Sequence, residues 1–115
     1  MSISASLSTH ILDLERGMPA VGVSVTVTAK NEGAYAEVHR GVTDNDGRIK
    51  DWSPGATLSS GLWELRFDVG SWYRSRGETS FYPHIVICFE VDGTHKHLHV
   101  PLLLNRYGYT TYRGS

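Results

Sequence analysis

Residues 21–28 read Val-Gly-Val-Ser-Val-Thr-Val-Thr, and this stretch decides the fold class. Its four valines occupy every second position and alternate with glycine, serine and threonine. A two-residue period places all four valines on one face of an extended chain, whereas a helix would scatter them around its axis. Valine also favours strands because its branched side chain packs well on a pleated surface. The stretch therefore predicts a strand with one buried face and one exposed face.

Similar short segments lie on both sides of this strand, separated by turns rich in Gly, Pro, Asn and Asp. The predicted strands are residues 7–14, 21–28, 35–43, 48–52, 62–69, 84–91, 95–104 and the closing segment from Tyr109. Turns are predicted at 31–33 and at 44–47, and one short helix at 70–77. Eight short strands with frequent turns indicate an all-β protein, an antiparallel β-sandwich.

Length and composition limit the possible classes of protein. The chain has 115 residues, 40% of them hydrophobic and 20% charged, so we expect residues 1–115 to form a single domain with its own core. A net charge of -1 does not favour nucleic-acid binding, which needs a basic surface. No apolar stretch reaches the length of a membrane span, so no membrane partner is expected. The first residues lack the basic start and apolar core of a signal peptide, so we expect a cytoplasmic protein.

The chain contains a single cysteine, Cys88, and therefore no internal disulfide. Cys88 lies in the apolar run Ile-Val-Ile-Cys-Phe at residues 85–89. Free cysteine behaves as a small apolar side chain and is often buried. The sequence therefore predicts a thiol in the core.

The predicted strand at 95–104 has two faces of different character. One face carries Leu98, Val100, Leu102 and Leu104, which we expect to pack in the core. The opposite face carries His95, His97, His99, Pro101 and Leu103. Because that face combines histidines with apolar residues, and a single domain has nothing left to cover it, we expect a partner subunit there.

Three interpretations of the histidines are open at this point. The first is a solvated polar face without a specific role. Alternatively, His97 and His99 begin a zinc site, which His95 or His10 would complete. The third interpretation is acid–base catalysis by a histidine that titrates near neutrality, which requires other polar groups to converge on it.

Several segments together resemble the transthyretin-related proteins, the 5-hydroxyisourate hydrolases. The matching motifs are Leu-Ser-Thr-His-Ile-Leu-Asp at 7–13, Gly-Met-Pro-Ala at 17–20, Thr-Asp-Asn-Asp-Gly-Arg at 43–48, Phe-Tyr-Pro at 81–83, His-Leu-His-Val-Pro-Leu-Leu-Leu at 97–104 and Tyr-Arg-Gly-Ser at 112–115. The resemblance covers nearly the whole chain. Its closing tetrapeptide is the motif that distinguishes the hydrolases from the hormone-carrying transthyretins.

The resemblance implies a transthyretin-like antiparallel β-sandwich of two four-stranded sheets with one short helix. It implies a homotetramer, a dimer of dimers, with sites in a channel where the dimers meet. The implied activity is that of a cyclic amide hydrolase in purine catabolism. It opens 5-hydroxyisourate to 2-oxo-4-hydroxy-4-carboxy-5-ureidoimidazoline and needs no metal or other cofactor. The alternative is a transthyretin-like carrier that binds an aromatic small molecule in the same channel.

The resemblance also implies which residues act. It places catalytic groups at His10, Arg48, His99 and Ser115, and substrate contacts at His10, Arg48, Tyr112 and Arg113. Hydrolysis requires a base for the water, positive charge for the developing oxyanion and a proton for the leaving nitrogen. His10 and His99 are expected to supply the base and its orienting partner, in either order. Ser115 would act through its hydroxyl or through the terminal carboxylate.

Overall fold

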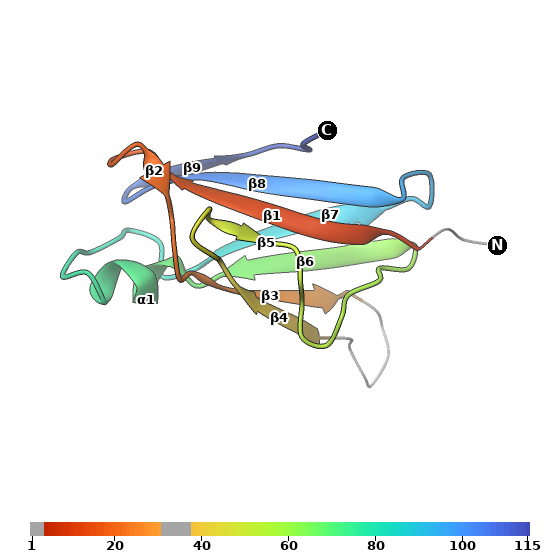
Figure 1. Cartoon of the computed structure of the whole chain (residues 1–115). Helices are drawn as coiled ribbons and strands as arrows, with labels where there is room; N and C mark the ends of the chain where they lie inside the picture. Colours follow the sequence, from red (N-terminus) through yellow and green to blue (C-terminus); the bar gives the residue numbers. More distant parts are fainter. Residues whose placement is uncertain (1–3, 31–37) are drawn as a thin grey trace.

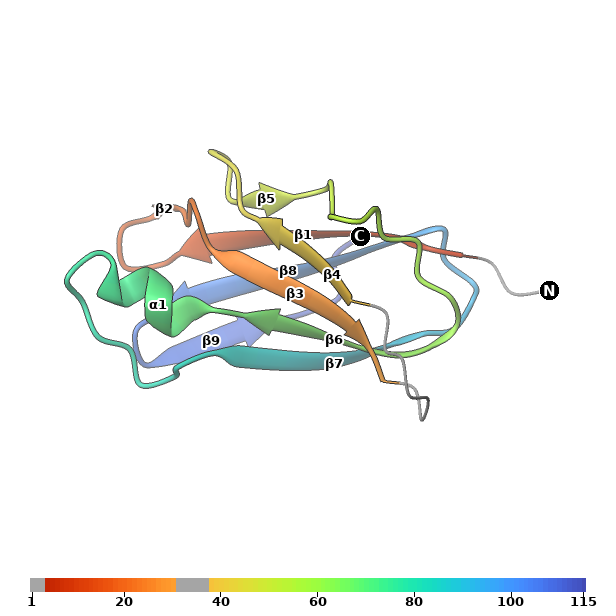
Figure 2. The ribbon, with the colours of Figure 1, turned by 90° about the horizontal axis from the view of Figure 1, so that it is seen from below.

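The computed structural model describes residues 4–30 and 38–115, which form two β-sheets stacked face to face with a short helix at one end (Figure 1; Figure 2). The first sheet has the order β2 (Met18–Pro19), β1 (Ser6–Asp13), β8 (His97–Asn105) and β9 (Gly108–Thr111), and β5 (Arg48–Ile49) also pairs with β1. The second sheet has the order β4 (Val38–Val42), β3 (Ser24–Ala29), β6 (Gly61–Phe67) and β7 (Ile85–Val91). The helix is α1 (Val69–Arg74).

This architecture confirms the predicted sandwich of two sheets and, within the described residues, its single short helix; the first sheet has a fifth strand because β5 also pairs with β1. The pairs are antiparallel except at the centre of the first sheet, where β1 and β8 run parallel. The short strand β2 was not predicted; it lies between the strands expected at 7–14 and 21–28. The turn predicted at 31–33 and the first part of the strand predicted at 35–43 lie outside the described residues. Within residues 4–30 and 38–115, no helix is long and apolar enough to span a bilayer.

The core lies between the two sheets and follows the predicted two-residue periods. From β6, Trp63, Leu65 and Phe67 are buried, and from β8 the four residues at 98, 100, 102 and 104 are buried as predicted. Each such apolar side chain stabilises the fold by about 1.5–3 kcal/mol when it is fully removed from water. Burying one face of β8 turns its other face outward, and that outer face carries the candidate site.

The prediction of a buried thiol was wrong, because Cys88 is exposed. β7 is the last strand of the second sheet and packs only one face on the core. Ile85 and Val91 are buried, whereas Val86 and Cys88 lie on the outer face. The continuous apolar run at 85–89 concealed this alternation.

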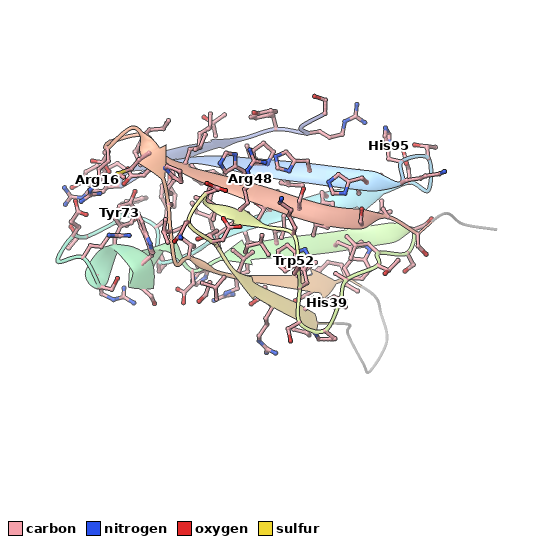
Figure 3. The ribbon with its side chains drawn as sticks, viewed as in Figure 1. Arg16, His39, Arg48, Trp52, Tyr73 and His95 are labelled. Carbon is pink, nitrogen blue, oxygen red and sulfur yellow. The ribbon has the colours of Figure 1, made fainter. Side chains whose placement is uncertain are left out.

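The predicted ladder of three histidines is also shorter than expected. β8 begins at His97, and His95 lies in the preceding loop, apart from Arg48 (Figure 3). His95 Nε2 is 3.4 Å from Arg113 Nη1, and its Nδ1 is 2.9 Å from Thr94 Oγ1. Of the three histidines, only His97 and His99 therefore lie on the outer face of the strand.

Candidate active site

Most of the predicted site residues meet on the outer face of the first sheet. There β1 lies between β5 and β8, and His10 is opposite Arg48 on one side and Pro101 on the other. Two positions earlier on β1, Ser8 is opposite His99. Side chains at alternate strand positions share a face, so residues far apart in the sequence meet on this surface.

The turn at residues 44–47 positions Arg48 on this face. Asp44 Oδ1 accepts hydrogen bonds from the backbone N–H groups of Asp46, at 2.9 Å, and Arg48, at 3.0 Å, and these bonds lower the pKa of the Asp44 carboxyl. Gly47 has φ +74°, and a Cβ there would lie 2.5 Å from the carbonyl oxygen of Ile11. Only glycine therefore allows β5 to approach β1 this closely.

The C-terminal segment reaches the same site by continuing past β9 alongside β8 (Figure 1). The backbone N–H of Gly114 donates to the carbonyl of His99 at 2.8 Å. A Cβ at position 114 would lie 2.6 Å from His99 Cδ2, so the glycine lets the tail pass directly over the imidazole. This contact brings Ser115 next to His99.

A cavity of ≈ 470 Å³ lies on this surface. It is lined by Ser6, Leu7, Ser8, Thr9, Arg48, Lys50, His97, His99 and Ser115. Of the predicted catalytic residues, Arg48, His99 and Ser115 therefore line one cavity, and His10 lies beside Arg48 in the sheet. Tyr112 and Arg113 instead line a smaller hollow of ≈ 290 Å³, together with apolar residues of β7 and β8.

Two cationic side chains, Arg48 and Lys50, line the cavity. The side chains of Arg48 and Lys50 are exposed, and neither has an ion pair or side-chain hydrogen bond within the part of the chain that the structure describes. His99 is partly buried, and its pKa is lowered by this burial first and then by the positive charges of Arg48, His10 and His97. A histidine with a lowered pKa is neutral near pH 7 and is available to accept a proton.

A row of hydrogen bonds connects β1 and β8 along the cavity floor. Ser6 Oγ lies 2.5 Å from His97 Nδ1, and Ser8 Oγ lies 2.9 Å from His97 Nε2 and 2.8 Å from His99 Nδ1. Among the described residues, His99 Nε2 and the ring of His10 have no hydrogen-bond partner. The other nitrogen of His99 is therefore free to meet a ligand.

Sequence reasoning did not select Ser8 or Lys50, and it considered His97 only as a possible zinc ligand. The alternation of Ser6, Ser8 and His10 in β1 indicated that these three side chains share a face, but it did not identify the neighbouring strand. Lys50 follows Arg48 at the same two-residue spacing, which was the available signal for a second cation.

The zinc interpretation lacks a third ligand in this arrangement. Among residues 4–30 and 38–115, no three His, Cys, Asp or Glu side chains gather as a ligand set for a metal ion. Of the two residues considered for completing the set, His95 lies in the loop before β8, and His10 does not form such a group with His97 and His99. The arrangement instead joins a neutral imidazole to a free guanidinium, which suits general-base attack of water on a carbonyl group.

Known proteins resemble the chain over almost its full length. The sequence model described as the HIUase/Transthyretin family matches residues 7–114. A 5-hydroxyisourate hydrolase of Salmonella dublin is 42% identical over 109 residues, which cover 95% of this chain and 80% of the relative. The structure of Klebsiella pneumoniae 5-hydroxyisourate hydrolase superposes with a TM-score of 0.83 at 35% identity, covering 96% of this chain and 99% of that one. Sea bream transthyretin in complex with thyroxine gives a TM-score of 0.84 at 28% identity, covering 96% and 95% of the two chains. The chain therefore belongs to the HIUase/Transthyretin family.

Proposed function

We infer that this protein is a 5-hydroxyisourate hydrolase, which opens its substrate to 2-oxo-4-hydroxy-4-carboxy-5-ureidoimidazoline in the breakdown of urate. The names of the hydrolase relatives support this activity over 95% or more of the chain. The observation in this chain that carries the inference is the pairing of a neutral His99 with an unpaired Arg48 in one cavity. That pairing combines a base with a cation for the oxyanion.

We propose that His99 is the general base. Its Nε2 accepts a proton from water as the water oxygen attacks the ring carbonyl, and negative charge develops on the carbonyl oxygen. Arg48 stabilises that charge, because its guanidinium makes no ion pair within the described chain and is available to the oxyanion. The C–N bond then breaks, and the protonated imidazole returns its proton to the leaving nitrogen. His10, opposite Arg48, is placed to orient the substrate.

The tail is proposed to complete the site. Ser115 lines the cavity and is held there by the contact between Gly114 and His99. Its hydroxyl would position the attacking water. Tyr112 and Arg113 remain proposed substrate contacts, because they immediately precede the residues that enter the cavity.

The alternative, a carrier for an aromatic small molecule, is less well supported. The transthyretin neighbour is 28% identical, whereas the hydrolases above are 35% and 42% identical. The cavity lining also argues against a hydrophobic ligand, because it includes Arg48, Lys50 and two histidines.

We further propose a homotetramer in which a partner subunit covers the outer face of the first sheet. Leu103, on the same face as His99, is only partly buried in the isolated chain and would be covered by such a contact. A cytoplasmic location is proposed as well, because an exposed, unpaired Cys88 suits a reducing compartment. Light scattering and cell fractionation test these two points.

The activity is tested by generating 5-hydroxyisourate with urate oxidase and following its ultraviolet decay. The protein is expected to accelerate this decay, and the Arg48→Met variant to lose about 10²-fold or more in kcat/KM. Arg74→Met is the matched control, since Arg74 is an exposed residue of α1 at the end of the sandwich. Decay at the spontaneous rate with the wild-type protein would overturn the proposal.

A further inference from the structure

Four side chains along β1 and β8 form a row of hydrogen bonds in which the donors and acceptors follow one direction. Ser6, His97, Ser8 and His99 follow one another on the outer face, with each hydroxyl opposite an imidazole in the parallel register. Both nitrogens of His97 are engaged, one by each serine. At the first end of the row, the Ser6 hydroxyl also donates to the backbone carbonyl of Lys96 at 3.3 Å.

The protons in this row can be counted. Each serine hydroxyl and each neutral imidazole has one proton to donate. The Lys96 carbonyl can only accept, so it takes the Ser6 proton. Ser6 Oγ must then accept from His97 Nδ1–H, and His97 Nε2 becomes an acceptor for the Ser8 hydroxyl.

The last link follows from the first three. Once Ser8 has donated its proton to His97, its oxygen accepts from His99 Nδ1–H. All four hydrogen bonds are made, and His99 Nε2 keeps its lone pair.

The reverse arrangement is poorer for two reasons. If the Ser6 proton went to His97 Nδ1, the hydrogen bond to the Lys96 carbonyl would be lost. His99 would also carry its proton on Nε2, so that an N–H group and not a lone pair would face a cavity lined by the cations of Arg48 and Lys50.

We propose that Ser8 and His97 are positioning residues that fix the tautomer of His99, with its proton on Nδ1 and the lone pair of Nε2 presented to the cavity. The proposal rests on the proposed function, because it explains how His99 is held ready as the base. Neither Ser8 nor His97 exchanges a proton with substrate. Their effect is to decide which nitrogen of His99 accepts one.

Nitrogen NMR of the histidine rings tests this directly in the full-length protein. Two-bond and three-bond correlations between ring protons and ¹⁵N distinguish the Nδ1–H from the Nε2–H tautomer, and the His99→Asn variant identifies the His99 signals by their loss. At a pH where the ring is neutral, wild-type His99 is expected to be the Nδ1–H form. Finding the Nε2–H form in the wild-type protein would overturn the proposal, whatever the activity.

Two variants show whether the row causes the tautomer. No hydrogen bond joins the rings of His97 and His99, but His97→Leu frees the Ser8 proton to go to His99 Nδ1, so His99 is expected to change to the Nε2–H form. Ser8→Thr keeps a hydroxyl at the same position and is expected to retain the Nδ1–H form. His95→Gln is the matched control, since His95 is outside the row. An unchanged His99 tautomer in folded His97→Leu would refute the role of the row.

Kinetics separate this proposal from the proposed function. Ser8→Ala and His97→Leu are each expected to lower kcat for 5-hydroxyisourate by roughly 10–10²-fold with a smaller change in KM, because they remove part of a general-base contribution of about 10²–10⁴-fold. Ser8→Thr should restore most of the loss. If the tautomers behave as described and the protein does not hydrolyse 5-hydroxyisourate, the positioning row stands and the assigned substrate fails. If the protein is active and the tautomers do not change, the row fails alone.

Discussion

Gly114 lies so close to His99 that a Cβ at position 114 would be 2.6 Å from the imidazole Cδ2. The backbone N–H of Gly114 also donates to the His99 carbonyl. The tail and the imidazole therefore hold each other in place, and a change to one displaces the other.

Gly114→Ala is expected to lower kcat/KM by about tenfold or more, because a methyl group must push away either the tail or the ring of the base. A misplacement of about 1 Å is enough for such losses. Gly108→Ala is the matched control, since the nearest atom to its added Cβ would be Asn105 Oδ1 at 3.6 Å, an ordinary contact. Equal kcat/KM values for Gly114→Ala and the wild type would contradict the tail's role.

The pKa of His99 is expected to lie below the ordinary value of 6.5 in the folded protein. Activity should then fall only when the pH drops below the usual histidine range, because the neutral ring is the active form. Removing the positive charge of Arg48 in Arg48→Met should raise the pKa of His99, since that charge disfavours the protonated ring. NMR titration of the His99 ring protons measures this without requiring activity.

The same titration in Arg74→Met provides the reference. A His99 pKa that is identical in the wild type and in Arg48→Met would show that Arg48 does not act on the ring.

Lys50 is expected to contribute to the binding of substrate oxygens. Lys50→Met should raise KM by about two- to fivefold with little change in kcat, as expected for an exposed charge worth roughly 0.2–1 kcal/mol. The effect should shrink as salt is added, because salt screens exposed charges. Lys30→Met is the control, since Lys30 lies next to Glu64 of the second sheet, with Nζ and Oε2 3.5 Å apart. A loss confined to kcat would assign Lys50 a different role.

Gly47→Ala is expected to destabilise the protein by about 1–3 kcal/mol, measured by urea unfolding. Its Cβ would lie 2.5 Å from the Ile11 carbonyl oxygen, in addition to the cost of a positive φ. Gly17→Ala isolates the contact, because Gly17 has a similar φ of +67° and open space around it. If both variants lose the same stability, the close approach of β5 to β1 has no energetic consequence.

The sequence allowed the sandwich to be predicted because its strands keep strict two-residue periods. The alternation around Leu65 in β6 and Leu102 in β8 correctly indicated which residues face the core. The same periods place His99 on the outer face. Periodicity is a local property, however, and it does not state which strand lies next to which. The contact between Ser8 and His99 depends on a parallel pairing that no local pattern encodes.

Cys88 and His95 illustrate two further limits. The apolar run around Cys88 is compatible with both a buried strand and an edge strand, and only the position of β7 in the sheet decides between them. His95 continues the two-residue period of His97 and His99, but β8 begins two residues later, at His97. Strand ends depend on where a neighbouring strand stops pairing, and that information is not local.

The parallel pairing of β1 with β8 has a consequence for folding. Ser8 and His99 are 91 positions apart in the sequence, yet their side chains are in direct contact. Contacts of such high sequence separation close the largest loop of the chain and raise the contact order, so they are entropically costly to form early. A chain still emerging from the ribosome has β1 available long before β8 is released. Turnover therefore reports on the completed fold. A folding intermediate without the pairing of β1 and β8 does not hold His99 in its working position.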